Sequence, residues 1–325
     1  MKKKIAILLI VIMMFASISG CSAKGTAASN KNIKILFSVS DGSDSFRNLL
    51  TTGAEDYAKS QDIDLKVMDA AGSIEAQVSH MKEAVSDGYN AILCAPVNPD
   101  TALQLKKAAQ GIPIIFLNSS PSDDALEKNK YIYVASNEEV AGRYQAEYIA
   151  DYLKNKNDLK VVLLKGEKSH SATLGRTKAV KDTFKEKGIN VDYVFEDNAN
   201  WSREGAKDMF DVFLSTNRKF DAIICNNDEM ALGVIESLKE HKIDPEAIPI
   251  VGIDATADGC KSISDGSMKF TVYQSAKGQA KSAVDAAAQI VSGNDISKLE
   301  NADEEGKHIW VPFERVDNSN VSQYS

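Results

Sequence analysis

The sequence predicts an α/β protein built from two doubly wound lobes. Its 325 residues are too many for a typical single core and suit two domains. From residue 33 onward, short apolar runs typical of buried parallel strands alternate with helical segments that carry one apolar face. This alternation runs to residue 153 and starts again at residue 161, which predicts two sheets of the same type. No stretch of low complexity separates the two halves, so short hinge crossovers are expected rather than a linker.

The first half of the chain supplies the elements of one sheet. Apolar runs predict strands at residues 33–39, 65–68, 91–95, 114–117 and 132–134. Helical periodicity predicts helices at residues 46–59, 74–85, 102–109 and 140–153. Gly88 follows the second helix, and Pro113 introduces the fourth strand. Strictly alternating strands and helices imply a parallel sheet with right-handed crossovers.

The second half repeats the pattern. Strands are predicted at residues 161–165, 191–195, 222–225, 248–253 and 270–273. Helices are predicted at residues 173–187, 203–214 and 279–291, from Asp228 onward, and near Cys260. The tail at residues 316–325 is polar and is expected to fray.

The N-terminus predicts export from the cytoplasm. Three lysines precede an apolar run at residues 5–15, and the small-residue stretch Ile18-Ser19-Gly20-Cys21 follows. This order is typical of a signal peptide, and the last four residues resemble a bacterial lipobox, so a lipoprotein signal peptide is predicted at residues 1–20 with lipidation of Cys21. A plain signal peptide or a membrane anchor is the alternative. Residues 21–32 have the composition of a flexible tether.

The charge and the cysteine content argue against a nucleic-acid partner, a disulfide framework and a zinc site. The net charge is −8 and no basic stripe is present, so nucleic acid is not an expected partner. Beyond Cys21 only Cys94, Cys225 and Cys260 remain, an odd number that argues against a disulfide framework. No Cys/His pairing has the spacing of zinc ligands, and neither a metal nor a cofactor is expected.

Polar and aromatic residues follow the predicted strands at the sheet edge where open α/β sheets bind ligands. Carboxylates, amides, arginine and histidine supply acceptors and planar donors that suit vicinal hydroxyls. Two aromatic residues offer flat apolar faces for the C–H side of a pyranose ring. The sequence therefore predicts that one small polyol is bound by Asp44, Phe46, Asn118, His170, Arg176, Trp201, Asn227, Asp254 and Gln274.

Each of these residues also has an ordinary structural interpretation. Asp44 and Asp228 are candidates for helix N-caps, and for Asp228 capping is favoured over ligand contact. Asn118 could instead satisfy the backbone of a turn, where asparagine is common. Trp201 could instead pack in the apolar core, as most aromatic residues do. Arg176 lies in a predicted helix, and the alternative to ligand contact is that its side chain is exposed on the surface.

Taken together, the motifs resemble a known family. The runs VLLKGE at residues 162–167, NNDEMALG at 226–233 and VGID at 251–254 resemble the bacterial periplasmic-type sugar-binding proteins of the ribose/galactose type. Over residues 33–318 the chain is most similar to the galactose/glucose-binding receptors of ABC transporters. The resemblance implies two Rossmann-like lobes of the type I periplasmic binding protein fold, joined by a three-segment hinge. The N-terminal lobe would comprise residues 33–136 plus 276–309, and the C-terminal lobe residues 137–275 plus 310–325.

The resemblance also assigns roles within the site, with three departures. It implies that the nine residues above are the ligand-binding set, with Gln274 at a position where galactose/glucose receptors have Asn and ribose receptors have Gln. Ala172 stands where those receptors carry a sugar-binding Asp, and Ser40 about where they have Tyr, so a substituted glycoside or another polyol competes with free glucose or galactose as the ligand. Residues 154–160 are too short and lack the spaced carboxylates of the family's calcium loop, so no structural calcium is expected.

The implied function is capture of a glucose- or galactose-like monosaccharide or glycoside for an ABC permease. The protein would be a monomer, extracytoplasmic and lipid-anchored through Cys21 to the outer face of the cell membrane. A receptor for ribose, inositol or another polyol that feeds chemotaxis or a sensor kinase is the alternative. An enzyme is not expected: a glycosidase could use Asp44 with Asp254, but hydroxyl recognition accounts for both carboxylates.

Overall fold

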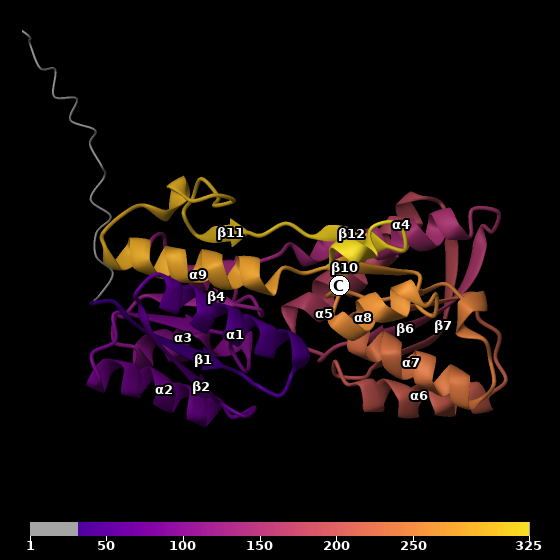
Figure 1. The fold of residues 1–325 in the computed structure, drawn as a ribbon, viewed down its shortest axis with the longest axis horizontal. Helices are drawn as coiled ribbons and strands as arrows, with labels where there is room; N and C mark the ends of the chain where they lie inside the picture. Colours follow the sequence, from indigo (N-terminus) through magenta and orange to yellow (C-terminus); the bar gives the residue numbers. More distant parts are fainter. Residues whose placement is uncertain (1–31, 325) are drawn as a thin grey trace, which may run out of the picture.

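The computed structural model describes residues 32–324 and shows two lobes that lie side by side, each built on a six-stranded sheet (Figure 1). The predicted signal peptide, Cys21 and nearly all of the predicted tether lie outside the described residues. Within residues 32–324, no helix is both long and apolar enough to cross a bilayer.

The first lobe holds a wholly parallel sheet in the order β11-β5-β4-β3-β1-β2. Its strands are β1 (Lys34–Val39), β2 (Asp64–Asp69), β3 (Ala91–Cys94), β4 (Ile114–Leu117), β5 (Tyr131–Ala135) and β11 (His308–Trp310). Its helices are α1 (Ser45–Ser60), α2 (Ile74–Ser86), α3 (Ala102–Ala108) and α9 (Ala276–Val291). Although α9 comes late in the chain, it packs against α1 and shares the apolar core of this lobe (Figure 1).

The second lobe holds a sheet in the order β12-β10-β9-β8-β6-β7, in which only β12 is antiparallel to its neighbour. Its strands are β6 (Asp158–Lys165), β7 (Asn190–Asn198), β8 (Ala222–Cys225), β9 (Ile250–Val251), β10 (Phe270–Tyr273) and β12 (Glu314–Asp317). Its helices are α4 (Glu138–Tyr152), α5 (Ser171–Glu186), α6 (Arg203–Ser215), α7 (Asp228–Glu240) and α8 (Ala257–Ser264).

The structure confirms the predicted two-lobed α/β fold and corrects three details. The strand expected at residues 248–253 is limited to Ile250–Val251. The strands β11 and β12 were not predicted, because three or four residues at a sheet edge give no periodic signal. The prediction of a frayed tail is wrong: β12 pairs with β10, and the side chains of Val316 and Val321 are buried in the core of the second lobe.

The chain crosses between the sheets three times, at residues 136–137, 274–275 and 311–313. Hydrogen bonds hold these crossovers together: Nε2 of Gln279 donates to Oγ of Ser136 at 3.1 Å, and the amide of Val311 donates to the carbonyl of Ala135 at 2.9 Å. Short crossovers of this kind permit the two lobes to rotate about one another as rigid bodies.

Candidate functional site

A small cavity of about 290 Å³ lies between the lobes, lined by residues that follow strands of both sheets. The structure brings all nine predicted residues to this cavity: Asp44, Phe46, Asn118, His170, Arg176, Trp201, Asn227, Asp254 and Gln274. Arg47 and Ala172 complete the lining. The carboxyl ends of the strands in the two sheets therefore supply one shared site, as the topology requires.

The first lobe contributes a helix start and a strand end. Asp44 is the N-cap of α1, and its Oδ1 accepts a hydrogen bond from the amide of Arg47 at 2.8 Å. The capping interpretation and the site interpretation of Asp44 are therefore compatible. Asn118 follows β4 directly with a φ of 62°, a left-handed conformation that asparagine tolerates better than most residues. This bend turns the Asn118 side chain into the cavity.

Arg47 is the lining residue that the sequence prediction missed. Its side chain is only 6% exposed, Nε donates to Oδ1 of Asn118 at 3.2 Å, and a terminal nitrogen donates to Oε1 of Glu167 in the other lobe at 3.4 Å. An arginine in the first turn of a helix has no local signal that distinguishes it from a surface residue. Its burial depends on contacts with Asn118 and Glu167, which lie 71 and 120 positions away in the sequence.

His170 connects the second lobe to Asn118. Its Nδ1 accepts from the amide of Ala172 at 3.2 Å, which places the proton on Nε2, and Nε2 lies 3.1 Å from Oδ1 of Asn118. Burial, together with the positive charges of Arg47 and Arg176, holds the pKa of His170 well below 6.5, so the ring is neutral. Since Oδ1 of Asn118 already accepts from Arg47 and His170, the amide presents its Nδ2 donor to the cavity.

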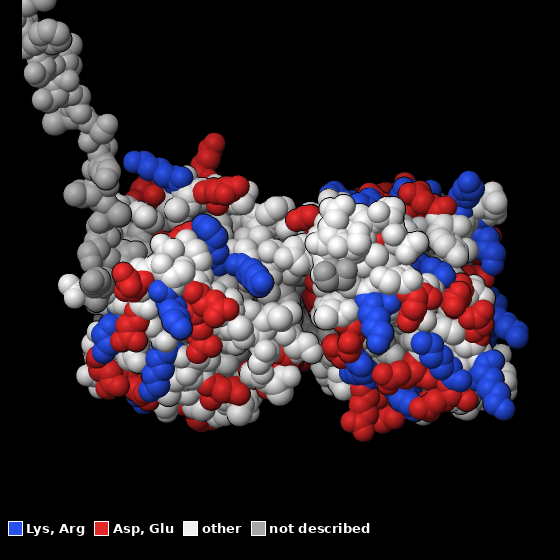
Figure 2. Space-filling model, in the orientation of Figure 1, with Lys and Arg blue, Asp and Glu red and all other residues white. Residues whose placement is uncertain are grey.

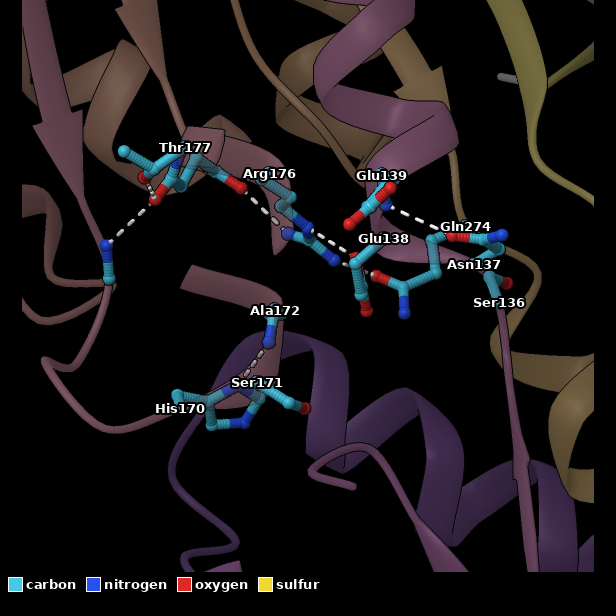
Figure 3. Close-up of polar contacts among 12 residues, drawn as sticks. Ser136, Asn137, Glu138, Glu139, His170, Ser171, Ala172, Arg176, Thr177 and Gln274 are labelled. Carbon is cyan, nitrogen blue, oxygen red and sulfur yellow. Dashed lines mark hydrogen bonds and ion pairs between the residues drawn. The ribbon is translucent and has the colours of Figure 1, made fainter. Parts of the chain in front are cut away.

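Arg176 is buried, which rules out the surface alternative. Its Nε donates to Oε2 of Glu138 at 2.6 Å, and its two terminal nitrogens donate to the carbonyl of Asn226 at 2.6 Å and to Oε1 of Gln274 at 2.9 Å (Figure 3). Gln274 therefore turns its Nε2 away from the arginine, and this buried nitrogen has no hydrogen-bond partner among the described residues. The ion pair with Glu138 is a second feature that the sequence did not reveal.

Trp201 and Asn227 form one wall of the second lobe. Trp201 has a φ of 66° and its ring packs over Gly166, where a Cβ would overlap the indole. The Nε1 of Trp201 is buried and lacks a hydrogen-bond partner within residues 32–324. Asn227 caps α7 through Oδ1, which accepts from the amide of Met230 at 3.0 Å. The expectation that Asp228 is the cap is therefore wrong.

Asp228 instead supports the loop that carries Asp254. It is fully buried and accepts from Oγ1 of Thr271 at 2.6 Å and from the amide of Thr256 at 2.9 Å. Asp254 has a φ of 123°, and its carboxyl group lines the cavity. Burial holds the pKa of Asp254 well above its usual value; Arg176 opposes this shift, whereas Asp228 and Asp44 add to it. The carboxyl group of Asp254 is therefore available to a bound molecule.

Comparison with known proteins agrees with the two-lobed fold of this chain. A family model described as a periplasmic binding protein domain matches residues 35–295. The chain belongs to this family.

Several members of the periplasmic binding protein family are similar along nearly their whole length. A putative rhizopine-binding protein of Rhizobium meliloti is 35% identical, with 92% of this chain and 94% of the relative aligned. The D-galactose/methyl-galactoside binding periplasmic protein MglB of Haemophilus influenzae is 29% identical over 99% of both chains. An ABC transporter solute binding protein from Bacillus halodurans C-125, solved with bound myo-inositol, superposes with a TM-score of 0.80 at 27% identity, covering 92% of this chain and 99% of that chain.

In this periplasmic binding protein the lobes touch around the cavity. The amide of Ser120 in the first lobe donates to Oγ of Ser171 in the second at 2.9 Å, and Ser45 lies 3.4 Å from Glu229. The structure therefore shows the lobes in contact over a small enclosed volume.

Charged side chains of both signs are mixed on the surface and in the site. Figure 2 shows acidic and basic side chains interspersed over both lobes, without a large patch of one sign on this face. Within residues 32–324, no group of three or more His, Cys, Asp or Glu side chains is arranged to hold a metal ion. The cavity combines two carboxylates with several N–H donors, which is the donor and acceptor set of a hydroxyl-rich molecule.

Proposed function

We propose that this chain is an extracytoplasmic solute-binding protein that encloses one ring-shaped polyol between its lobes and delivers it to an ABC permease. The observation that carries the proposal is the cavity itself: side chains of both lobes line it, so one small molecule bound there contacts both lobes. A ligand that contacts both lobes stabilises their closed arrangement, which is the form that a permease would recognise.

The unpartnered groups of the cavity support a ligand with many hydroxyls. Nε1 of Trp201 and Nε2 of Gln274 are buried donors without partners among the described residues, and the carboxyl group of Asp254 lines the same cavity. A buried polar group without a partner costs about 1–3 kcal/mol, so a ligand that supplies these hydrogen bonds gains affinity. Molecules that lack the matching hydroxyls are rejected for the same reason.

Some relatives are named for ribose and xylitol, so the choice of a six-membered ring is our proposal and starts from two others. One is named for galactose and methyl-galactoside, and one was solved with myo-inositol. These ligands share a ring that bears adjacent hydroxyls, and we propose a glucose- or galactose-like monosaccharide, a glycoside or a cyclitol for this chain. Ala172, which is buried in the lining, supplies no acceptor and leaves room for a substituent on the ring. All these relatives are named as binding proteins, which supports binding rather than catalysis.

The proposal includes the anchor, the oligomeric state and the limits of the lobes. Cys21 would carry the lipid after removal of residues 1–20, and the protein would act as a monomer on the outer face of the cell membrane. The lobes would comprise residues 33–136 with 276–309, and residues 137–275 with 310–325. A Cys21→Ser variant that stays in the membrane fraction of the producing cells would contradict the proposed anchor.

Thermal unfolding in the presence of candidate ligands tests the proposal. The purified protein without its leader is screened against galactose, glucose, methyl-galactoside, ribose and myo-inositol, and positive results are measured by calorimetry. A ligand at about 100 times its Kd should stabilise the protein by about 2.7 kcal/mol. The Asp254→Asn variant should lose this response. Absence of any response across polyols would contradict the proposed function.

A further inference from the structure

A second polar space, which is partly open to solvent, lies against the cavity and is here called the outer chamber. Residues of both lobes line it, from the loop and first turn of α1 on one side and from residues 200–203 on the other. Asp44, Arg47 and Trp201 line both the outer chamber and the cavity. These three side chains therefore form the partition between the two spaces.

Two members of the partition are held by the fold, and the third, Arg47, closes it with the end of a long side chain. Asp44 caps α1, and Trp201 packs over Gly166. Arg47 is held at its guanidinium end by a 3.2 Å hydrogen bond to Asn118 and a 3.4 Å contact with Glu167, whose side chain is 41% exposed. A passage between the two spaces would require Arg47 to break both contacts and adopt another rotamer, which an arginine side chain can do without a movement of the backbone.

The lining of the outer chamber has the chemistry of a sugar subsite. Ser43 and Ser45 are exposed and contribute hydroxyls, and Asn200 contributes an exposed amide on a left-handed turn with a φ of 54°. Arg203 and Glu229, which are joined at 2.8 Å, contribute donors and acceptors that already neutralise one another. The outer chamber thus offers both donors and acceptors, which suits the hydroxyl groups of a second ring.

The charge balance of the outer chamber excludes an anionic substituent. Four carboxylates line it, from Asp41, Asp44, Glu167 and Glu229, against the guanidinium groups of Arg47 and Arg203. This surplus of negative charge disfavours a phosphorylated or acidic sugar. A neutral ring does not meet this electrostatic penalty.

We propose that the outer chamber is a subsite for the second ring of a neutral two-ring ligand, and that Arg47 is the side chain at the passage. The second ring would be joined to the first at a different position from the small substituent beside Ala172, because Ala172 does not line the outer chamber. The proposal rests on the proposed function, because the first ring would occupy the cavity. It extends the ligand class from single-ring polyols to two-ring ones.

Paired variants test the subsite. Ser45→Trp fills the outer chamber from a position that does not line the cavity, and Thr52→Trp places the same side chain at an exposed site of α1 outside both spaces. Calorimetry compares galactose and myo-inositol with nitrophenyl galactoside, lactose and melibiose. Ser45→Trp should weaken two-ring ligands by about tenfold or more relative to single-ring ones, whereas Thr52→Trp should leave this ratio unchanged.

Arg47→Ala provides an independent measurement should Ser45→Trp disturb folding or closure. Removal of the arginine widens the passage, so the affinity for a two-ring ligand should rise relative to that for a single ring. If single rings bind but no two-ring ligand binds either the original protein or Arg47→Ala, the subsite proposal is overturned while the proposed function stands. If no polyol binds at all, the proposed function itself fails.

Discussion

Nε2 of His170 donates a hydrogen bond to Oδ1 of Asn118 at 3.1 Å and thereby joins the second lobe to the first. The same oxygen accepts from Nε of Arg47 at 3.2 Å, so the acceptor capacity of the Asn118 amide is used by the protein. Asn118 therefore faces the cavity as a donor. This orientation follows from the hydrogen bonds of its neighbours and leads directly to a test.

Replacing Asn118 by Asp should weaken binding without unfolding the protein. The carboxylate keeps an acceptor for His170 and Arg47 but offers the ligand no N–H donor. We expect a loss of affinity of about tenfold to a hundredfold, because leaving a buried polar group unpaired costs about 1–3 kcal/mol. Calorimetry with the best ligand of the screen measures the loss. Asn217→Asp, at an exposed turn with a similar φ of 55°, is the matched control and should change nothing.

Glu138 should be required for stability, unlike its neighbour Glu139. Glu138 pairs with Arg176 at 2.6 Å with both side chains less than 10% exposed, whereas Glu139 pairs with Lys178 at 3.1 Å with both side chains about 60% exposed. Removing one partner of a buried pair costs about 3–5 kcal/mol, and an exposed pair contributes about 0–1 kcal/mol. Urea unfolding of Glu138→Gln and Glu139→Gln compares the two directly. If Glu138→Gln and Glu139→Gln lower the unfolding free energy equally, the buried pair contributes no more to stability than the exposed one.

The fold and most of the site could be predicted because both depend on local patterns. Apolar runs mark the strands, and residues that follow parallel strands meet at one edge, which is why Asn118 and Asp254 were predicted from the sequence. Arg47 and Glu138 could not be predicted, because their burial depends on partners 120 and 38 positions away. The cap of α7 was misassigned because Asn227 and Asp228 are adjacent and both residue types are good caps.

The stability of the protein should respond to pH through Asp228. Burial outweighs the hydrogen bonds from Thr271 and Thr256 and raises the pKa of Asp228 to about 7, compared with about 3.9 in an unfolded chain. The folded state therefore binds this proton more tightly, and the resulting stabilisation is present below about pH 4 and is lost as the pH rises through about 7.

Asp228→Asn removes this titration. The original protein should lose this stabilisation between pH 4 and 7, and the variant should not. The unfolding free energy of the variant minus that of the original protein should therefore rise over this range, by at most about 1.4 kcal/mol per pH unit. Urea unfolding at several pH values measures the difference, with Asp56→Asn at an exposed position as the control for loss of one carboxylate. Parallel pH profiles of Asp228→Asn and the original protein would contradict the assignment.

The ligand specificity of the cavity should be set in part by Ala172. This buried residue lines the cavity next to His170 and contributes no hydrogen-bonding group from its side chain. Ala172→Asp adds a carboxylate that accepts from a hydroxyl and occupies the space available to a substituent. We expect free hexose to bind more tightly, because charge-assisted hydrogen bonds are the stronger ones, and a glycoside to bind more weakly.

Ala172→Asn separates the two effects of the aspartate. Asparagine has nearly the same volume but no charge, so it should weaken the glycoside to a similar extent while improving hexose binding less. Calorimetry with galactose and methyl-galactoside gives the ratio of the two affinities for each protein. A ratio that stays constant across alanine, asparagine and aspartate would show that position 172 does not contact the substituent, and the room beside Ala172 would then have no role in selecting the ligand.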